Sequence, residues 1–154
     1  MDDQLLCSRL RALSEGVEYE VTLLANAAAL LFQSMERLNW AGFYLMRRGE
    51  LVLGPFQGRT ACVKIAVGKG VCGTAAERDE TQLVADVHEF PGHIACDSAS
   101  RSEIVIPLHR DGKVRGVLDI DSPELSRFTE ADKRGLEAFA SVLEELLGKA
   151  ASIQ

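Results

Sequence analysis

A cysteine in a polar loop is the first residue of this sequence whose surroundings favour chemistry. Cys96 lies in PGHIACDSASRSE, residues 91–103, among turn-forming and hydroxyl residues and just before the apolar run EIVIPL. A cysteine kept for packing behaves as a small hydrophobe and belongs in an apolar segment. A reactive thiol instead needs partial exposure and polar surroundings that favour the thiolate. The pattern therefore predicts that Cys96 is a reactive thiol.

Three acidic residues form a second candidate group. Asp119 and Asp121 are two apart in VLDIDSP, so on a strand their side chains leave the same face. Glu103 opens the segment EIVIPLHRDGKVRGVLDIDSP, which is typical of a hairpin turning at Asp111-Gly112. Counting outward from that turn places residues near 103–104 opposite residues near 119–120, so we expect Glu103 and Asp119 to be cross-strand neighbours. Like charges crowded together raise the pKa of at least one carboxyl, and a carboxyl held protonated can act as a general acid. The alternative is a solvated edge whose charges only prevent pairing with other strands.

The spacing of the remaining cysteines argues against a metal site. Cys7, Cys62 and Cys72 form no C-x-x-C pair with one another or with Cys96, so no zinc ribbon or thioredoxin-type motif is present. A zinc site built from Cys62, Cys72, Cys96 and His93 would lack the paired short spacings of structural zinc sites. We therefore expect neither a metal nor a cofactor.

A glycine-rich segment resembles a nucleotide-binding motif. GKGVCG, residues 68–73, matches G-x-G-x-x-G, and Asp86 ends a later strand. However, the helix expected next, TAAERDETQ, is short and mostly polar, whereas a crossover helix must pack an apolar face on a parallel sheet. We expect these glycines to form a tight turn at the rim of a pocket.

The elements that must position these residues follow from the period of the apolar residues. We expect helices within residues 2–37 with a break at Ser14–Gly16, strands within 39–56, 61–67 and 81–87, a loop over 87–102, the hairpin, and a helix within 128–150 that begins at Thr129. Helices followed by about six strands and a final helix predict an α+β fold. A central antiparallel sheet would carry the N- and C-terminal helices on one side.

Aromatic residues of the first strand divide between its two faces. Trp40 and Tyr44, in NWAGFYL, lie on the same face as Gly42, whereas Phe43 lies on the opposite face. We expect Phe43 to be in the core. Trp40 and Tyr44 are predicted to form an aromatic pocket wall, which would suit a sulfur-bearing methyl group.

Composition limits the classes of protein to consider. A chain of 154 residues is expected to form one domain. The net charge of -6 argues against nucleic acid or anionic lipid as a partner. No apolar run is long enough to span a membrane, and the N-terminus MDDQLLCSRL lacks the features of a secretory signal. We therefore expect a cytoplasmic protein without membrane contact.

Four segments together resemble one family. NWAGFYL, LVLGPFQGRTACVKIAVGKGVCGTAA, ADVHEFPGHIACDSASRSEIVIPL and GVLDIDSPELSRFTEAD are similar to the free methionine-(R)-sulfoxide reductases, which are built on a single GAF domain. The resemblance covers residues 36–135. It implies that residues 1–154 form a single GAF domain that reduces free L-methionine-(R)-sulfoxide to L-methionine, with thioredoxin regenerating the thiols.

The resemblance also implies roles for the cysteines. Cys96 matches the attacking cysteine of the family, Cys62 matches the resolving cysteine, and Cys72 matches a third cysteine that could be an alternative partner. The sequence leaves open whether Cys62 or Cys72 closes the disulfide. Cys7 lies outside the shared motifs.

The acids and the tryptophan match family positions as well. Glu103 and Asp121 correspond to the pair that bonds the sulfoxide oxygen, with Asp119 supporting them. Trp40 corresponds to the residue placed against the substrate methyl group. Together with the cysteines, these residues make a thiol-dependent reductase the leading hypothesis.

Two other classes of protein remain as alternatives. One is a non-catalytic GAF module that senses a small ligand, because fold does not fix function. The other is a redox-responsive dimer joined through its terminal helices. The periodic apolar residues within 5–35 and 129–147 also make a homodimer an expectation for the enzyme itself.

Overall fold

The computed structural model describes residues 2–152. Two helices come first, as expected: α1 (Asp3–Leu13) and α2 (Glu20–Ser34). The break between them contains Gly16 with φ of 74°, a left-handed conformation that glycine adopts readily. The last helix, α4 (Glu130–Leu147), begins with a capping box in which Thr129 and Asp132 bond to each other's backbone N–H.

A single six-stranded sheet lies at the centre of the fold. Its strands are β1 (Trp40–Arg47), β2 (Glu50–Gly58), β3 (Lys64–Ala66), β4 (Gln82–Val84), β5 (Ser102–Arg110) and β6 (Lys113–Ser122). They are arranged in the order β3-β2-β1-β6-β5-β4, and each neighbouring pair is antiparallel. The predicted α+β class and antiparallel sheet are confirmed.

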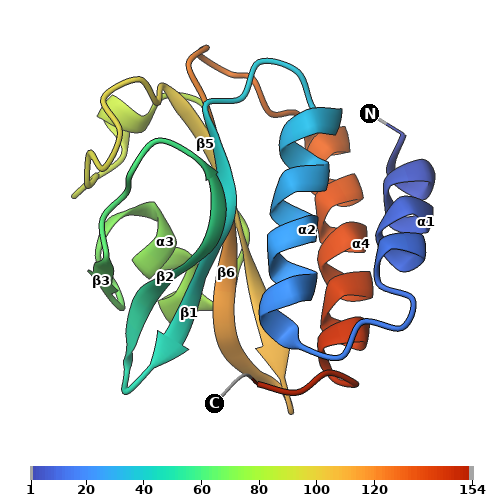
Figure 1. Ribbon diagram of the computed structural model, residues 1–154. Coiled ribbons are helices and arrows are strands. Elements are labelled where there is room, and N and C mark those ends of the chain that lie inside the picture. Colours follow the sequence, from blue (N-terminus) through green and yellow to red (C-terminus); the bar gives the residue numbers. More distant parts are fainter. Residues whose placement is uncertain (1, 153–154) are drawn as a thin grey trace.

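The two faces of the sheet carry different layers. Helices α2 and α4 cover one face with α1 packed against their outer side, and α3 (Gly70–Arg78) lies on the other face (Figure 1). Phe43, Leu118 and Phe139 are fully buried between the helices and the sheet. A second apolar cluster, which includes Trp40, Tyr44 and Cys72, lies on the α3 side. Phe43 is therefore in the core, and the two aromatic residues face the opposite layer, as the alternation predicted.

The third strand is shorter than predicted. The segment ACVKIAV contributes only Lys64–Ala66 to the sheet, and Val63, expected to alternate with Ile65, is 68% exposed. Residues 59–63 instead form an irregular connection that carries Cys62.

The β5–β6 hairpin turns at Asp111-Gly112 as predicted, but a bulge changes its register. Leu108 pairs with Gly116 and His109 pairs with Val114, so Arg115 has no partner in the ladder. The Arg115 guanidinium reaches across to the buried Glu20 carboxylate at the start of α2, with N–O distances of 3.1 and 3.2 Å. The unpaired Arg115 shifts all pairs on the side away from the turn, from Leu108–Gly116 to Ser102–Ser122, by one residue.

None of the helices in the part of the chain described here has both the length and the apolar composition needed to cross a membrane.

Candidate active site

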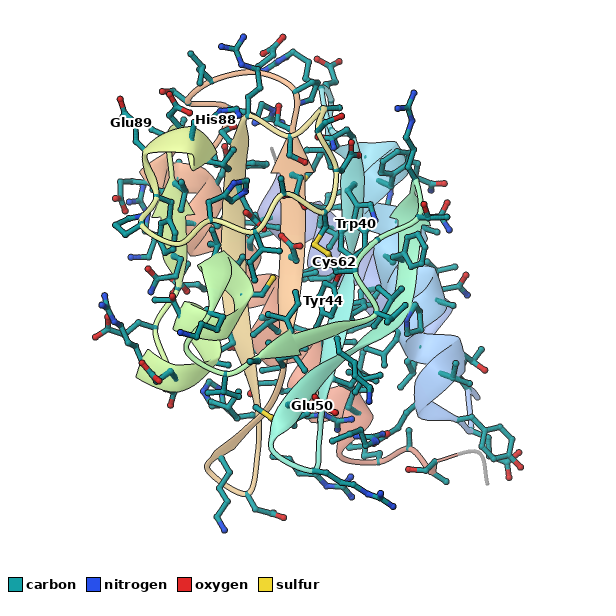
Figure 2. The ribbon with its side chains drawn as sticks, turned by 90° about the vertical axis from the view of Figure 1, so that its left-hand side faces the viewer. Trp40, Tyr44, Glu50, Cys62, His88 and Glu89 are labelled. Carbon is teal, nitrogen blue, oxygen red and sulfur yellow. A yellow bond between two sulfur atoms is a disulfide. The ribbon has the colours of Figure 1, made fainter. Side chains whose placement is uncertain are left out.

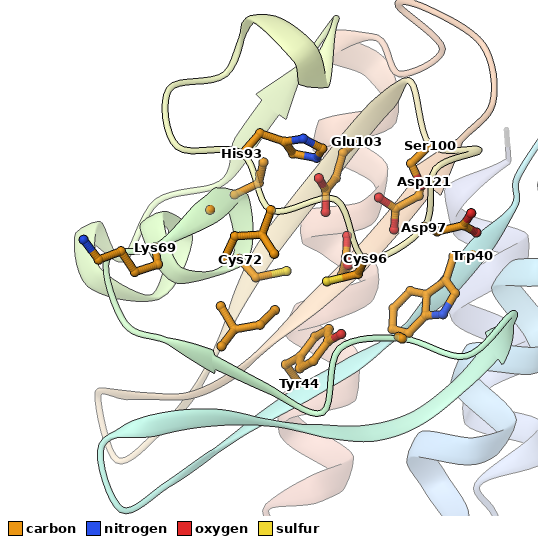
Figure 3. A pocket seen from close by; sticks show the side chains of 16 residues that line it. Trp40, Tyr44, Lys69, Cys72, His93, Cys96, Asp97, Ser100, Glu103 and Asp121 are labelled. Carbon is orange, nitrogen blue, oxygen red and sulfur yellow. The ribbon is translucent and has the colours of Figure 1, made fainter.

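A pocket opens on the α3 side of the sheet. It lies between β1, β6, β5, the N-terminus of α3 and the loop that carries Cys96 (Figure 3). Its empty volume is about 500 Å³, counting the part open to solvent. The lining residues include seven of the eight predicted site residues: Trp40, Tyr44, Cys72, Cys96, Glu103, Asp119 and Asp121.

The eighth predicted residue, Cys62, is bonded to Cys96. Their Sγ atoms form a disulfide that joins residues 34 apart in the chain, with a Cα–Cα distance of 5.4 Å (Figure 2 labels Cys62). Cys7 and Cys72 are free thiols. The structure thus pairs Cys62 rather than Cys72 with Cys96, a choice that the sequence left open.

The loop carrying Cys96 is tied to the sheet by one asparagine. Asn39, just before β1, donates from Nδ2 to Asp97 Oδ2 at 3.0 Å and to Ser100 Oγ at 2.9 Å. Asp97 also accepts from the Ala99 N–H at 2.9 Å, which closes a tight turn after the cysteine. The polar residues around Cys96 therefore hold an irregular segment above the pocket, and sequence reasoning did not identify Asn39.

The carboxyl groups meet as a cluster, with one change from the predicted pairing. Glu103 lies directly opposite Asp121, and Asp119 lies opposite Val105. Without the bulge at Arg115, Glu103 would lie opposite Ile120, and the bulge moves its partner to Asp121. Asp119, predicted to be a cross-strand neighbour of Glu103, therefore lies diagonally from it on the same face of the sheet. All three acids remain on the pocket face and are buried, with 6–7% exposure.

Burial determines the protonation of these acids. Loss of hydration raises the pKa of Asp119 and Asp121 well above that of an ordinary aspartate, and neighbouring carboxylates raise it further. For Asp119 these neighbours are Asp121 and Glu103; for Asp121 the nearby Glu103 is the main one. The cluster therefore holds protons in a site where they can be delivered to a bound oxygen.

The raised pKa of Asp119 predicts a pH-dependent stability. The folded state binds a proton more tightly than the unfolded state, so the stabilisation is complete at low pH and is lost as pH rises through the raised pKa. Asp119→Asn removes this loss, so the stability of the variant relative to the parent should increase with pH. Denaturant unfolding at several pH values measures the effect. Asp111→Asn, in the exposed hairpin turn, is the control that should show no such trend.

Two aromatic rings, those of Trp40 and Tyr44, line one wall of the pocket, and a third ring packs against Trp40. Trp40 stacks on Phe56 with ring centroids 5.1 Å apart and on Tyr44 at 5.9 Å. Gly42 makes this arrangement possible, because a Cβ at that position would lie 2.3 Å from the Phe56 Cβ. Trp40 and Tyr44, predicted for this wall, both line the pocket, and Phe56 supports the Trp40 ring by stacking on it.

The polar atoms of this wall bind the segment that carries Cys62. The Trp40 Nε1–H donates to the Arg59 carbonyl at 3.1 Å, and the Tyr44 hydroxyl donates to the Cys62 carbonyl at 2.9 Å. The aromatic residues therefore shape the pocket and also fix the position of the second cysteine.

The glycine-rich segment forms the start of α3 rather than a nucleotide site. Gly70 has φ of 62°, and a Cβ there would lie 3.2 Å from the Ile94 side chain in the Cys96 loop. A Cβ on Gly73 would lie 2.4 Å from the Ala66 carbonyl. The glycines thus allow close packing of α3 at the pocket rim, as expected, and the antiparallel neighbouring strands provide no crossover unit.

The N-terminus of α3 offers backbone donors to the pocket. Gly70, Val71 and Cys72 line the cavity, and Lys69 at the N-cap position makes no side-chain capping bond. The first N–H groups of a helix have no intrahelical acceptor and favour a negative charge. Lys69 and His93 also line the pocket (Figure 3), and sequence analysis assigned neither a role there.

Cys72 lies near two of the acids. Its Sγ and one carboxylate oxygen from each of Glu103 and Asp119 lie within 4.8 Å of one another, a spacing that could hold a metal ion. Burial raises the pKa of the Cys72 thiol well above its usual value, and the nearby carboxylates act in the same direction. Cys72 therefore stays protonated and is a poor nucleophile.

Comparison with known proteins gives a consistent result. A GAF domain model matches residues 22–147. The free methionine-R-sulfoxide reductase of Escherichia coli is 53% identical over 88% of this chain and 82% of its own. The enzyme of that name from Saccharomyces cerevisiae is 48% identical over 92% of this chain and 82% of its own. The structure of a free methionine-R-sulfoxide reductase from Neisseria meningitidis in complex with its substrate superposes with a TM-score of 0.92. The two chains are 42% identical, and the match covers 96% of this chain and 89% of the Neisseria chain.

Proposed function

Because the chain belongs to the GAF-domain family of free methionine-R-sulfoxide reductases, we propose that this enzyme reduces free L-methionine-(R)-sulfoxide in the pocket described above. One observation carries the proposal: the Cys62–Cys96 disulfide lies at a pocket that also contains buried carboxyl groups with raised pKa values. A thiol pair and a proton donor are what sulfoxide reduction requires.

The reaction begins at Cys96. Its thiolate attacks the sulfoxide sulfur while Asp121, assisted by Glu103, protonates the oxygen and makes it a better leaving group. The protonated oxygen then moves to Cys96 as the substrate S–O bond and the transient bond between the two sulfurs break, so that Cys96 becomes a sulfenic acid and methionine is released. Cys62 then displaces this oxygen as water and forms the disulfide. The balance is one sulfoxide and two thiols converted to methionine, one disulfide and one water.

A dithiol protein such as thioredoxin restores the two thiols by exchange. The position of the disulfide supports this step, because Cys62 and Cys96 are both only partly buried. Cys72 is buried and its thiol has a raised pKa, so it is less suited to attack the sulfenic acid.

The charges of the pocket suit a free amino acid. The substrate carboxylate binds at the N-terminus of α3, where backbone N–H groups and Lys69 line the cavity. The α-ammonium group donates hydrogen bonds to acids of the cluster, with Asp119 among them, because a protonated carboxyl still accepts through its second oxygen. Trp40 and Tyr44 contact the methyl-sulfur end of the substrate.

The assay that tests the proposal uses separated isomers. Purified protein with dithiothreitol is given the R or the S isomer of free methionine sulfoxide, and methionine is followed by chromatography. The proposal expects methionine from the R isomer alone. No methionine from either isomer, with folded protein and reduced thiols, would instead favour a sensor that binds without catalysis.

The Tyr44 hydroxyl provides a separate prediction about the second step. Tyr44→Phe keeps the aromatic ring but loses the bond to the Cys62 carbonyl, which is worth about 0.5–1.5 kcal/mol. We expect methionine formation in a single turnover to be nearly unchanged and disulfide formation to slow by about 2- to 10-fold. Rapid quenching with a thiol-trapping reagent separates the two rates. Tyr19→Phe is the matched control, and an equal loss in both steps would show that the hydroxyl acts on the substrate.

A further inference from the structure

A thiol and two carboxyl groups converge at the pocket from three different elements. Cys72 comes from α3, Glu103 from β5 and Asp119 from β6, and one ligand atom of each lies within 4.8 Å of the other two. All three side chains are buried, with exposures of 5–6%. The proposed reaction gives Cys72 no role, so its place beside the acids needs another explanation.

The cluster lacks a positive partner. Asp119 Oδ1 is buried and has no hydrogen-bond partner among residues 2–152, and none of the salt bridges in that range reaches Glu103 or Asp119. The nearby groups in the cluster are the Glu103 carboxyl and the Cys72 thiol. A buried, unpartnered carboxylate oxygen is costly and calls for a proton or a cation.

We propose that Cys72, Glu103 and Asp119 bind a divalent cation of the zinc type, and that this cation excludes the substrate from the pocket. One thiolate and two carboxylates are a ligand set that Zn²⁺ accepts, and three protein ligands leave a fourth position open toward the cavity. The thiolate ligand favours a softer cation such as Zn²⁺ over the hard cations Mg²⁺ and Ca²⁺, which prefer oxygen ligands. Binding displaces the thiol proton, because the thiolate is the ligand.

The site is independent of the redox pair. Cys62 and Cys96 are bonded to each other, so they offer no thiolate ligand in the disulfide form, whereas Cys72 remains free. The cation would use Glu103 and Asp119, which the proposed function assigns to substrate binding and proton transfer. Exclusion of the substrate therefore rests on the proposed function, but binding of the cation does not.

The test uses the disulfide form with Cd²⁺ as a probe that reports thiolate ligation by ultraviolet absorption. We expect one Cd²⁺–thiolate band that saturates at one equivalent per chain and is displaced by Zn²⁺. Cys72→Ser should abolish the band, and Asp119→Asn should weaken affinity at least about tenfold. Cys7→Ser is the control, because Cys7 packs in the core on the other face of the sheet. Loss of the band in Cys7→Ser, or no band in the parent protein, would overturn the proposal.

Two further measurements keep the outcome clear. At the same concentration, Zn²⁺ should raise the melting temperature of the oxidised parent protein by more than that of Asp119→Asn, so the conclusion does not depend on the folding of Cys72→Ser. Free methionine should raise the apparent Cd²⁺ dissociation constant severalfold. A Cd²⁺ band that methionine does not affect would retain the cation site but contradict exclusion of the substrate.

Discussion

Cys96→Ser is expected to reduce turnover of methionine-(R)-sulfoxide below detection. A serine hydroxyl at this position is neither acidic enough nor nucleophilic enough to attack sulfur, and it cannot accept the oxygen as a sulfenic acid. The remaining cysteine in the pocket, Cys72, does not substitute, because burial raises the pKa of its thiol. Steady-state assays with dithiothreitol measure the loss, and Cys7→Ser should retain parent activity.

Cys62→Ser separates the two halves of the same reaction. This variant keeps the attacking thiol, so we expect one equivalent of methionine per chain in the absence of reductant. Recycling by thioredoxin should then fail, because the disulfide that thioredoxin reduces cannot form between Cys62 and Cys96. Full thioredoxin-dependent turnover in Cys62→Ser would assign the resolving role to Cys72.

Asp121→Asn is the second change with a large expected effect. The amide cannot protonate the sulfoxide oxygen, and general acid catalysis contributes about 10²- to 10⁴-fold. We expect the single-turnover rate of methionine formation to fall by at least about tenfold. Glu103→Gln should also slow this step, since Glu103 lies directly opposite Asp121 on the paired strand.

The pH dependence distinguishes loss of the acid from a change in packing. Burial raises the pKa of Asp121, so its protonated form persists above the usual range for aspartate and the rate should fall only as pH rises through that raised value. Asp121→Asn should remove this limb of the profile. Asp111→Asn, in the hairpin turn, should leave both rate and profile unchanged. Unchanged single-turnover rates in Asp121→Asn would exclude it as the acid.

Local patterns were sufficient to predict most of the architecture. The breaks at Gly16 and Asp111-Gly112, the cap at Thr129 and the opposite faces of Trp40 and Phe43 are all confirmed. These features depend on backbone conformation and side-chain alternation within a few residues. That residues 1–154 act as one domain, and that the chain forms a homodimer, stay predictions.

Features that depend on distant partners were predicted less well. A single bulged residue moves the partner of Glu103 from Ile120 to Asp121, and local patterns did not predict this bulge. The bulge coincides with a contact between Arg115 and Glu20, which lie 95 positions apart in the chain. The choice of Cys62 over Cys72 depends on how the 59–63 segment and the Cys96 loop fold over the pocket. No local pattern contains that information.

The residues that sequence analysis missed act through the backbone or through other side chains. Asn39 directly precedes Trp40 in NWAGFYL, but its contacts with Asp97 and Ser100 cross about 60 positions. His93 lines the pocket only because its loop folds back over the sheet. A polar residue at the start of an otherwise apolar strand was the one available signal for Asn39.

The central claim is that Cys96 and Cys62 carry the two electrons that reduce the sulfoxide. Its most direct test is a single turnover of the fully reduced protein with one equivalent of free methionine-(R)-sulfoxide, followed by thiol trapping and peptide mass spectrometry. We predict one methionine per chain together with one Cys62–Cys96 disulfide. Cys7 and Cys72 should remain free thiols and therefore be alkylated by the trapping reagent. Methionine formed while Cys62 and Cys96 are both recovered as alkylated thiols would contradict the account. A disulfide that joins Cys72 to Cys96 would also contradict it.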